Sequence, residues 1–419
     1  MNEMSVSVAV VGGGPAGLAA AVSAKKNGAE SVLVIERDNR LGGILKQCIH
    51  PGFGLNYFQK ELTGPEYAGA FREEAEKEGV EALLNAMVLS VDAMKREITL
   101  VSPECGMTRV RAKSIVLAMG CRERTRAGIQ IPGSRPAGIY TAGAAQRLAN
   151  LENALVGKSI VILGSGDIGM IMARRMTLEG CEVKAVVEIM DYLAGLTRNR
   201  VQCLDDFQIP LLLSHTVTRI VGNERVEGVY VAEVDKNRKP VPGTETFIAC
   251  DTLLLSVGLI PENELTRDAG IEIAPVTNGP VVDQHMQTSA PGIFASGNVV
   301  HVNDLVDNVT VESQTAGKYA ALYARDMLPA CERTVPAVPG MNIRYVCPQI
   351  LHIGPEEETV RLCFRVAAPK KDVVLTAVSG GKEIARRRER RVNPGEMCHL
   401  DLPTGAIEGG SVMISVVSQ

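Results

Sequence analysis

The pattern of hydrophobic and polar residues changes once along this chain, near residue 330. Before that point, short apolar runs alternate with longer alanine-rich segments, which predicts strands that alternate with helices and therefore a parallel sheet. Beyond it, apolar and polar residues alternate singly, as at 360–366 and 412–416, which is typical of half-buried strands. We therefore predict an α/β protein that ends in a small, mostly antiparallel β-sandwich.

A glycine cluster at 12–17 joins the first apolar strand to the first alanine-rich helix. Gly12 permits a tight turn, Gly14 lets the backbone approach a pyrophosphate, and Gly17 lets helix and strand pack closely. The helix N-terminus then faces the anion with its backbone N–H groups. The next strand ends in Glu36, whose carboxylate can accept both hydroxyls of an adenosine ribose. Strand, turn, helix and terminal acid together predict a nucleotide site rather than an unrelated glycine-rich turn.

The same unit recurs at 164–169, and its second strand ends in Glu188 at the same spacing from the last glycine. A repeat of this kind predicts a second dinucleotide site. Glu188 would repel a 2′-phosphate, and the residues at 189–191 include no arginine to receive one, so we favour NAD over NADP. Arg198 and Arg200 would weaken this preference if they folded back onto the site.

Composition narrows the class of protein further. Charged residues make up 22 % of the 419 positions, the formal net charge is −4, and aromatic residues are 4 % with no tryptophan, so a nucleic-acid-binding protein is not indicated. No apolar stretch is long enough for a membrane span. No two of the ten cysteines form a CxxC motif, which excludes a zinc ribbon or a thioredoxin-type dithiol within one loop, and we predict no metal site. Free thiols are typical of proteins in the reducing cytoplasm, so we predict that location.

The order of motifs resembles the pyridine nucleotide–disulfide oxidoreductase family over about residues 5–330. The motifs are GGGPAGL with Glu36, a Leu-Gly-Gly at 41–43, the strand SIVLAMG at 114–120, the second glycine turn, LLLSVGLIP at 253–261 and PGIFASGN at 291–298. The resemblance implies two Rossmann-like dinucleotide-binding domains, in which an NAD(H) domain at 126–272 is inserted between two FAD segments, 1–125 and 273–330. We assign the β-sandwich to 337–419.

The resemblance also implies which residues hold FAD and the nicotinamide dinucleotide. The expected cofactor-binding positions are Gly12, Gly14, Pro15, Ala16, Gly17, Glu36, Arg37, Gly42, Gly43, Gly120, Gly297 and Asn298 for FAD, with Gly164, Gly166, Asp167, Ile168, Gly169, Glu188 and Gly258 in the inserted domain and its closing motif.

One of these motifs departs from the family pattern. The family usually has Gly-Asp where this chain has Gly297-Asn298, so an uncharged amide oxygen would accept the hydrogen bond from the ribityl chain. The helix expected near 310–320 would point its N-terminus at the flavin pyrimidine, where reduction builds negative charge.

The family's redox dithiols, CxxxxC or CxxC, are absent, and a single cysteine, Cys48, follows Gly43. Its position resembles that of the redox cysteine in NADH oxidases and peroxidases of the same superfamily. Lys46 and His50 could lower its pKa and produce a reactive thiolate. The alternative is a buried structural cysteine, and His50 is either a proton donor beside the flavin or a loop histidine bonded to backbone.

The string QCIHPGFGL at 47–55, with KELTGPEYA at 60–68, resembles a bacterial subset that partners glycerol-3-phosphate dehydrogenase-like or amino-acid and opine oxidase-like flavoproteins. The resemblance implies an electron-transfer subunit of a homo- or hetero-oligomer, which passes electrons between NAD(H) and a partner flavoprotein or a small acceptor. A single-cysteine NADH oxidase or peroxidase, and a flavin-bearing scaffold without turnover, are the alternatives.

The tail begins with a proline-rich stretch, 329–339, which we interpret as a linker. A β-sandwich in this place departs from the mixed α/β dimer-interface domain of disulfide reductases. The basic run at 386–391 is either a solvated strand face or a docking site for an acidic partner.

Overall fold

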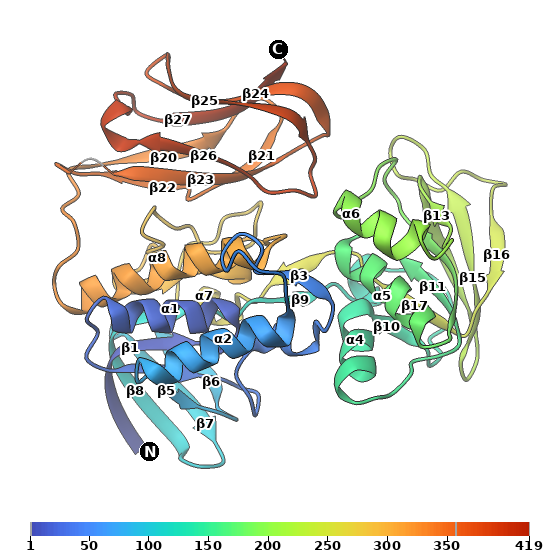
Figure 1. Ribbon diagram of the computed structural model, residues 1–419, viewed down its shortest axis with the longest axis horizontal. Helices are drawn as coiled ribbons and strands as arrows, with labels where there is room; N and C mark the ends of the chain where they lie inside the picture. The colour runs from blue at the N-terminus through green and yellow to red at the C-terminus, as the bar shows by residue number, and fades with distance from the viewer. Residues whose placement is uncertain (1, 357, 419) are drawn as a thin grey trace. The chain divides into compact units, whose positions relative to one another are not determined.

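The computed structural model describes residues 2–356 and 358–418, and the chain forms two compact units. Unit 2 is Arg122–Ile260, and unit 1 contains the residues on either side of it. Figure 1 shows the path of the chain. The chain leaves unit 1 in β9 (Cys121–Glu123) and returns to it in β18 (Leu259–Pro261).

The boundary at Ile260 differs from the expected end of the inserted domain at residue 272. The segment that begins at Pro261 belongs to unit 1 because its polar groups bond there. The Asn263 side-chain amide donates to the carbonyl oxygens of Asn278 and Val299, at 2.8 Å in both cases. The short helix α7 (Glu264–Asp268) follows directly.

The first layer of unit 1 is a seven-stranded sheet in the order β5-β2-β1-β8-β7-β6, with β19 paired to β8. The strands β2, β5, β8 and β19 run parallel to their neighbours, as βα units require, whereas β6 and β7 form an antiparallel hairpin. The bounds are β1 (Asn2–Val11), β2 (Val32–Ile35), β5 (Glu81–Leu83), β6 (Met87–Asp92), β7 (Glu97–Ser102), β8 (Gly106–Leu117) and β19 (Ile293–Ala295).

Three helices accompany this sheet: α1 (Pro15–Lys26), α2 (Gly64–Lys77) and α8 (Val306–Ala324). Figure 1 shows α8 alongside α1, although nearly 300 residues separate them in the sequence. The close packing of α8 against α1 depends on Gly317, because a Cβ added there would lie 2.0 Å from the carbonyl oxygen of Ala20. The small hairpin of β3 (Pro51–Phe53) and β4 (Leu62–Thr63) precedes α2.

Unit 2 contains a five-stranded parallel sheet, β10-β17-β11-β12-β13, and a three-stranded antiparallel sheet, β14-β15-β16. Separate hydrophobic clusters cover its two faces. The strands are β10 (Ile139–Thr141), β11 (Ser159–Leu163), β12 (Glu182–Val187), β13 (Leu211–Leu212), β14 (His215–Gly222), β15 (Val226–Glu233), β16 (Thr246–Ala249) and β17 (Thr252–Leu255), and the helices are α3 (Arg126–Ile129), α4 (Ala142–Leu151), α5 (Asp167–Leu178) and α6 (Thr197–Arg200).

The tail of unit 1 is the predicted β-sandwich, with sheets β22-β20-β27-β24-β25 and β21-β23-β26 enclosing one apolar core. All its ladders are antiparallel except that between β20 and β27. The strands are β20 (Arg333–Pro339), β21 (Ile343–Cys347), β22 (Ile350–Ile353), β23 (Thr359–Val366), β24 (Lys370–Ser379), β25 (Lys382–Val392), β26 (Cys398–Pro403) and β27 (Val412–Ser418).

Two details of the tail differ from the sequence prediction or refine it. The expected linker at 329–339 is partly a strand, because β20 accommodates Pro336 and Pro339 between β22 and β27. The basic run lies in β25, the edge strand, where Arg387 pairs with Glu389 at 2.9 Å and Arg391 with Glu396 at 3.3 Å.

Within the described residues, no helix is both long and apolar enough to span a bilayer.

Candidate functional site

The first glycine turn has the geometry that the sequence predicted. Gly12 has a φ of +106°, and an added Cβ would lie 2.4 Å from the carbonyl oxygen of Ala118. A Cβ at Gly17 would lie 1.8 Å from the carbonyl oxygen of Gly12, so only glycine lets α1 start this close to β1. Pro15 occupies the first turn of the helix, where its missing N–H costs nothing.

Glu36 closes this turn from the end of β2. Its buried carboxylate accepts the backbone N–H of Gly13 at 2.6 Å and that of Asp38 at 2.8 Å. The neighbouring Arg37 is exposed. The carboxylate is thus fixed beside the glycine turn, where an adenosine ribose would bind.

The Gly42-Gly43 pair lies against the same turn. Gly42 donates its N–H to the carbonyl oxygen of Gly13 at 2.8 Å, and a Cβ at Gly43 would lie 2.8 Å from Cα of Gly14. Both glycines have positive φ values, 117° and 54°. The two glycines therefore lie directly against the glycine turn that leads into the N-terminus of α1.

Of the two alternatives for Cys48, its surroundings match the buried cysteine rather than the reactive thiolate. Lys46 directs its ammonium group to Asp38 (2.5 Å), and His50 places Nδ1 3.0 Å from the carbonyl oxygen of Pro51. The Cys48 side chain is buried, and its Sγ lies 3.4 Å from the carbonyl oxygen of Ile44. Burial raises the pKa of the Cys48 thiol to about 12, so the expected lowering by Lys46 and His50 is wrong.

Sequence reasoning missed Asp307, which anchors the loop after Cys48. Its buried carboxylate accepts backbone N–H groups of Gly54 (3.2 Å), Asn56 (2.8 Å) and Tyr57 (3.3 Å). Nearby, the Tyr67 hydroxyl lies 2.7 Å from Oγ1 of Thr310. The first turns of α8 thus fix the 54–57 loop. An acidic residue in a first helical turn was the available signal, because that position favours negative charge.

Glu312, also on α8, organises the Gly297-Asn298 turn. It accepts the Gly297 N–H at 2.6 Å, and its other oxygen lies 2.7 Å from Nε2 of the buried His301. The Asn298 side-chain oxygen accepts the N–H of Asn303 at 2.9 Å. This oxygen, which we expected to face the ribityl chain, thus has a backbone donor already. Its second lone pair is the one left for a ligand.

Two other predicted positions in unit 1 are Gly120, in a turn, and Ala16, in helix α1. Gly120 follows β8 with a φ of +74°, and its carbonyl oxygen accepts the N–H of Glu262. Ala16 is buried at the start of α1, and a Cβ added to Gly297 would lie 2.8 Å from the Cβ of Ala16. These residues bring the two FAD segments together.

The second glycine turn, in unit 2, repeats the first. A Cβ at Gly164 would lie 2.0 Å from the carbonyl oxygen of Ser256, and one at Gly169 would lie 2.6 Å from that of Gly164. Glu188, buried at the end of β12, accepts the N–H and hydroxyl of Ser165 and the N–H of Met190. The two units therefore share this hydrogen-bonding pattern, in which the acid at the end of the second strand accepts backbone N–H groups of the glycine turn and of the residue two positions after itself.

The 194–199 loop, which follows β12 and whose last three residues form the start of α6, packs on this second turn. Asp167 accepts the N–H of Leu196 at 2.8 Å and the side-chain amide of Asn199 at 2.7 Å. A Cβ at Gly195 would lie 2.8 Å from the N atom of Asp167. Ile168, on the first turn of α5, packs against the adjoining core. A pyrophosphate that approaches the N-terminus of α5 therefore meets the 194–199 loop.

Gly258 lies further along unit 2, after β17. It has a φ of +100°, and its carbonyl oxygen accepts the N–H of Arg124 at 2.9 Å. Arg200, which would have weakened the preference for NAD, lies 3.6 Å from Asp205. The positions expected to hold FAD thus lie in unit 1, and those expected to hold the nicotinamide dinucleotide lie in unit 2.

The residues of unit 1 fit FAD. At Gly14 the nearest atom to an added Cβ is the Cα of Gly43, 3.8 Å away, so backbone can approach a pyrophosphate there. Gly14 has no side chain to cap α1, which leaves the first backbone N–H groups of the helix for an anion. Glu36 would supply the acceptor for the ribose.

Two glycine turns of this design, one in each unit, define a protein with two dinucleotide-binding domains. The model of the pyridine nucleotide-disulphide oxidoreductase family matches residues 6–318, and the chain belongs to this family. Its cofactors are FAD and NAD(P)H, and it is an oxidoreductase dependent on both.

Individual relatives are distant. The HcnB subunit of hydrogen cyanide synthase from Pseudomonas protegens is 25 % identical over 71 % of this chain and 66 % of its own length. An opine oxidase subunit from Rhizobium meliloti is 26 % identical over 70 % of this chain and 58 % of its own. Both matches span less than two thirds of the relative. Thioredoxin reductase of T. acidophilum shares the fold, with a TM-score of 0.63 and 24 % identity over 77 % of this chain and 99 % of that one.

Proposed function

We propose that this chain moves electrons between NAD(H) and a partner oxidoreductase by way of bound FAD. The observation that carries the proposal is the state of Cys48. The sequence lacks the family's CxxxxC and CxxC motifs, and the cysteine in their place is buried with a thiol pKa of about 12. A protonated thiol is a poor nucleophile, so electrons are expected to leave by a route other than thiol–disulfide exchange.

The roles of the binding residues follow from their contacts. Bound FAD supplies a ring that takes a hydride from reduced nicotinamide and passes the electrons on. Glu36 and the first turn of α1 would hold the adenosine diphosphate end, and Asp307 fixes the 54–57 loop next to the N-terminus of α8. The N-terminus of α8 favours negative charge in its vicinity.

Glu188 supports NAD rather than NADP as the nicotinamide substrate. Its carboxylate is held by Ser165 at 2.8 and 2.7 Å, and a 2′-phosphate placed beside it would be repelled. Arg200 is directed to Asp205. The 194–199 loop would have to shift to admit the pyrophosphate to α5.

The partner is inferred from the names of the relatives. HcnB and the opine oxidase relative are both, by name, subunits of larger enzymes. A partner that bears its own redox cofactor would accept electrons without a dithiol in this chain. Location in the cytoplasm stays a prediction.

The test is an anaerobic titration of the FAD-loaded protein with NADH and, in parallel, NADPH. We expect the flavin absorbance to bleach with about one equivalent of NADH and to respond weakly to NADPH. Steady-state turnover of NADH is then compared with ferricyanide, hydrogen peroxide and cystine as acceptors, in the wild type and in Cys48→Ser. Fast ferricyanide reduction that is equal in both proteins supports the proposal.

Two outcomes would contradict it. Rapid turnover with peroxide or cystine that disappears in Cys48→Ser would assign the chain to the single-cysteine oxidases and peroxidases. If the protein binds flavin stably but neither nucleotide bleaches it, the flavin-bearing scaffold without turnover would be the remaining alternative. A His50→Gln variant adds the remaining check, since a proton donor beside the flavin would show itself in the pH profile of turnover.

A further inference from the structure

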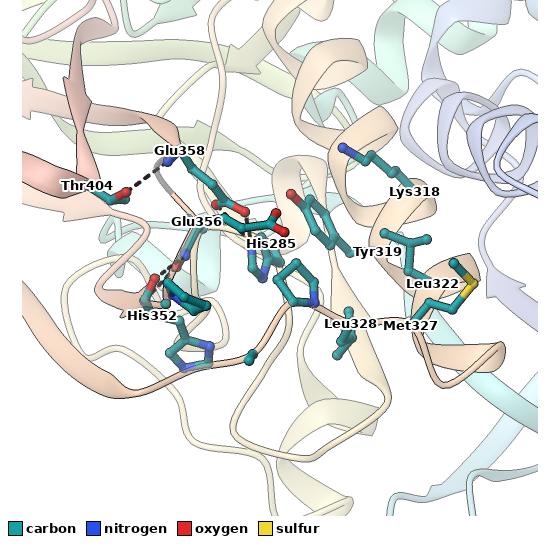
Figure 2. Close-up of a pocket in the computed structure, with 15 residues that line it drawn as sticks. His285, Lys318, Tyr319, Leu322, Met327, Leu328, His352, Glu356, Glu358 and Thr404 are labelled. Atoms are coloured by element: carbon teal, nitrogen blue, oxygen red, sulfur yellow. Dashed lines mark hydrogen bonds and ion pairs between the residues drawn. The ribbon is translucent and has the colours of Figure 1, made fainter.

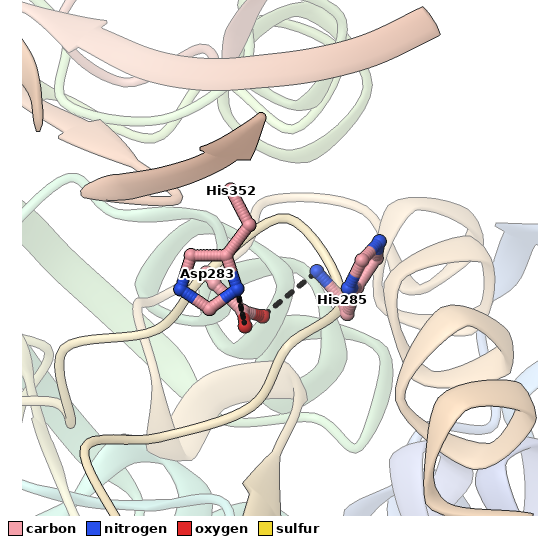
Figure 3. A group of neighbouring side chains, drawn as sticks. All are labelled: Asp283, His285 and His352. Atoms are coloured by element: carbon pink, nitrogen blue, oxygen red, sulfur yellow. Dashed lines mark hydrogen bonds and ion pairs between the residues drawn. The ribbon is translucent and has the colours of Figure 1, made fainter. Parts of the chain in front are cut away.

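Two imidazoles and a carboxylate meet where the β-sandwich adjoins the second FAD segment. Asp283 and His285 come from the irregular stretch before β19, and His352 lies in β22. One ligand atom of each residue lies within 4.8 Å of those of the other two. Figure 3 shows the Asp283 carboxylate between the two rings. Neither nucleotide site uses these residues.

The Asp283 carboxylate is oriented by the backbone. One oxygen, Oδ1, accepts the N–H groups of His285 and Gln287, each at 2.9 Å, and the other, Oδ2, lies 3.1 Å from Nδ1 of His352. The side chain is 4 % exposed. This arrangement leaves Oδ2 as the oxygen that faces the cluster.

His285 has the surroundings of a metal ligand. Its Nε2 lies 3.2 Å from the Glu358 carboxylate, and its ring stacks on Tyr319 with centroids 3.8 Å apart. A ligating histidine commonly donates its second ring N–H to a carboxylate, which fixes the ring and the tautomer. The contact with Glu358 leaves Nδ1 as the ring nitrogen with a lone pair for a cation.

His352 is positioned through its backbone. Its N–H donates to the Gln284 side-chain oxygen at 2.8 Å, and its carbonyl oxygen accepts the Gln284 amide at 2.7 Å. The ring borders a pocket of about 500 Å³, which His285, Glu358 and Lys318 also line (Figure 2). The pocket gives an ion a path to the cluster and room for a further ligand.

We propose that Asp283, His285 and His352 bind one divalent transition-metal ion, with zinc as the preferred ion, and that this ion fastens the β-sandwich to the FAD domain. Two neutral imidazoles and one carboxylate are a common zinc donor set, and three protein ligands leave one position for water or a ligand in the pocket. Zinc–ligand bonds of about 2.0–2.2 Å place the ligand atoms of a tetrahedral site roughly 3.3–3.6 Å apart, so atoms that now lie up to 4.8 Å apart would close in by at most about 1.5 Å. Binding through Nδ1 of His352 requires the neutral tautomer that carries its proton on Nε2, so bonds from Nδ1 and from Asp283 to the ion replace the contact between these two groups.

The test uses the full-length, FAD-loaded chain in a Cys331→Ser background, because the exposed Cys331 thiol could itself take up zinc. Protein stripped with a chelator is dialysed against ZnCl₂, and bound metal is measured by mass spectrometry together with the thermal midpoint. We expect about one zinc per chain and a raised midpoint. His352→Gln and Asp283→Asn should each weaken binding on the order of 100-fold.

His215→Gln is the matched control, since His215 is also a partly exposed histidine but lies in unit 2. Equal zinc in the wild type and both cluster variants would show adventitious binding and overturn the proposal. If a cluster variant fails to fold, the stripped wild type decides, because no zinc uptake and no shift in its midpoint would also overturn it. None of these readouts depends on NADH turnover, so the site and the proposed function fail or stand separately.

Discussion

The carboxylate of Glu188 accepts both the backbone N–H and the hydroxyl of Ser165, at 2.8 and 2.7 Å. In the other unit, Glu36 accepts the N–H of Gly13, the residue at the same place in the first glycine turn. Each acid therefore holds its turn in shape, in addition to the ribose contact that we propose for it. The serine hydroxyl is an addition found in the second turn.

Substitution of Glu188 should change the choice of nucleotide. We expect Glu188→Gln to weaken NADH binding roughly tenfold, because a hydrogen bond to a charged group is lost, and to lower the preference for NADH over NADPH. The measurement is kcat/KM for both nucleotides. Glu182→Gln, an exposed position of the same strand, should leave both values unchanged. An unaltered NADH to NADPH ratio in Glu188→Gln would remove this residue from the site.

Asp307 should contribute strongly to stability. Asp307→Asn exchanges a buried carboxylate with three N–H donors for an amide, and we expect the free energy of unfolding to fall by roughly 2–3 kcal/mol. Urea denaturation of the FAD-loaded protein measures it. Asp326→Asn, at an exposed left-handed position after α8, is the control, since asparagine tolerates that backbone. Equal losses in the two variants would show that the 54–57 anchor adds nothing.

The Cys48 thiol should resist alkylation. With its pKa raised to about 12 by burial, we expect iodoacetamide at neutral pH to modify the exposed Cys331 first and to leave Cys48 intact. Peptide mass spectrometry over time provides the readout. Labelling of Cys48 at the rate of Cys331 would mean that the thiol is accessible and ionised.

The same raised pKa predicts a pH dependence of stability. The unfolded thiol releases its proton near its ordinary pKa of 9.0, whereas the buried one holds it up to about 12. The free energy of unfolding should therefore fall as the pH rises through this window, by at most about 1.4 kcal/mol per pH unit from this group. Cys48→Ser should show a shallower decline between pH 9 and 11, and identical slopes would contradict the assignment.

Gly17 should tolerate no side chain. A Cβ there would lie 1.8 Å from the carbonyl oxygen of Gly12, so Gly17→Ala must push α1 away from β1. We expect a loss of roughly 1–3 kcal/mol in stability and a protein purified with little FAD. The A450/A280 ratio reports the flavin. Gly69→Ala, in α2, has open space around the new methyl group and should keep its flavin.

The sequence by itself determined the two βα turns, their terminal acids, the resemblance to the family and the change to a β-sandwich. Those features depend on residue spacing over one strand or one helix, and the glycine turns admit few other residues. Tertiary structure alone decided that Asp307 holds a loop 250 residues away, that Glu312 pairs with a buried His301, and that Asp283, His285 and His352 meet. It also decided the pKa of Cys48. The burial of a side chain and its bonding partners depend on which distant segments pack together in the folded chain, and no local sequence pattern determines this.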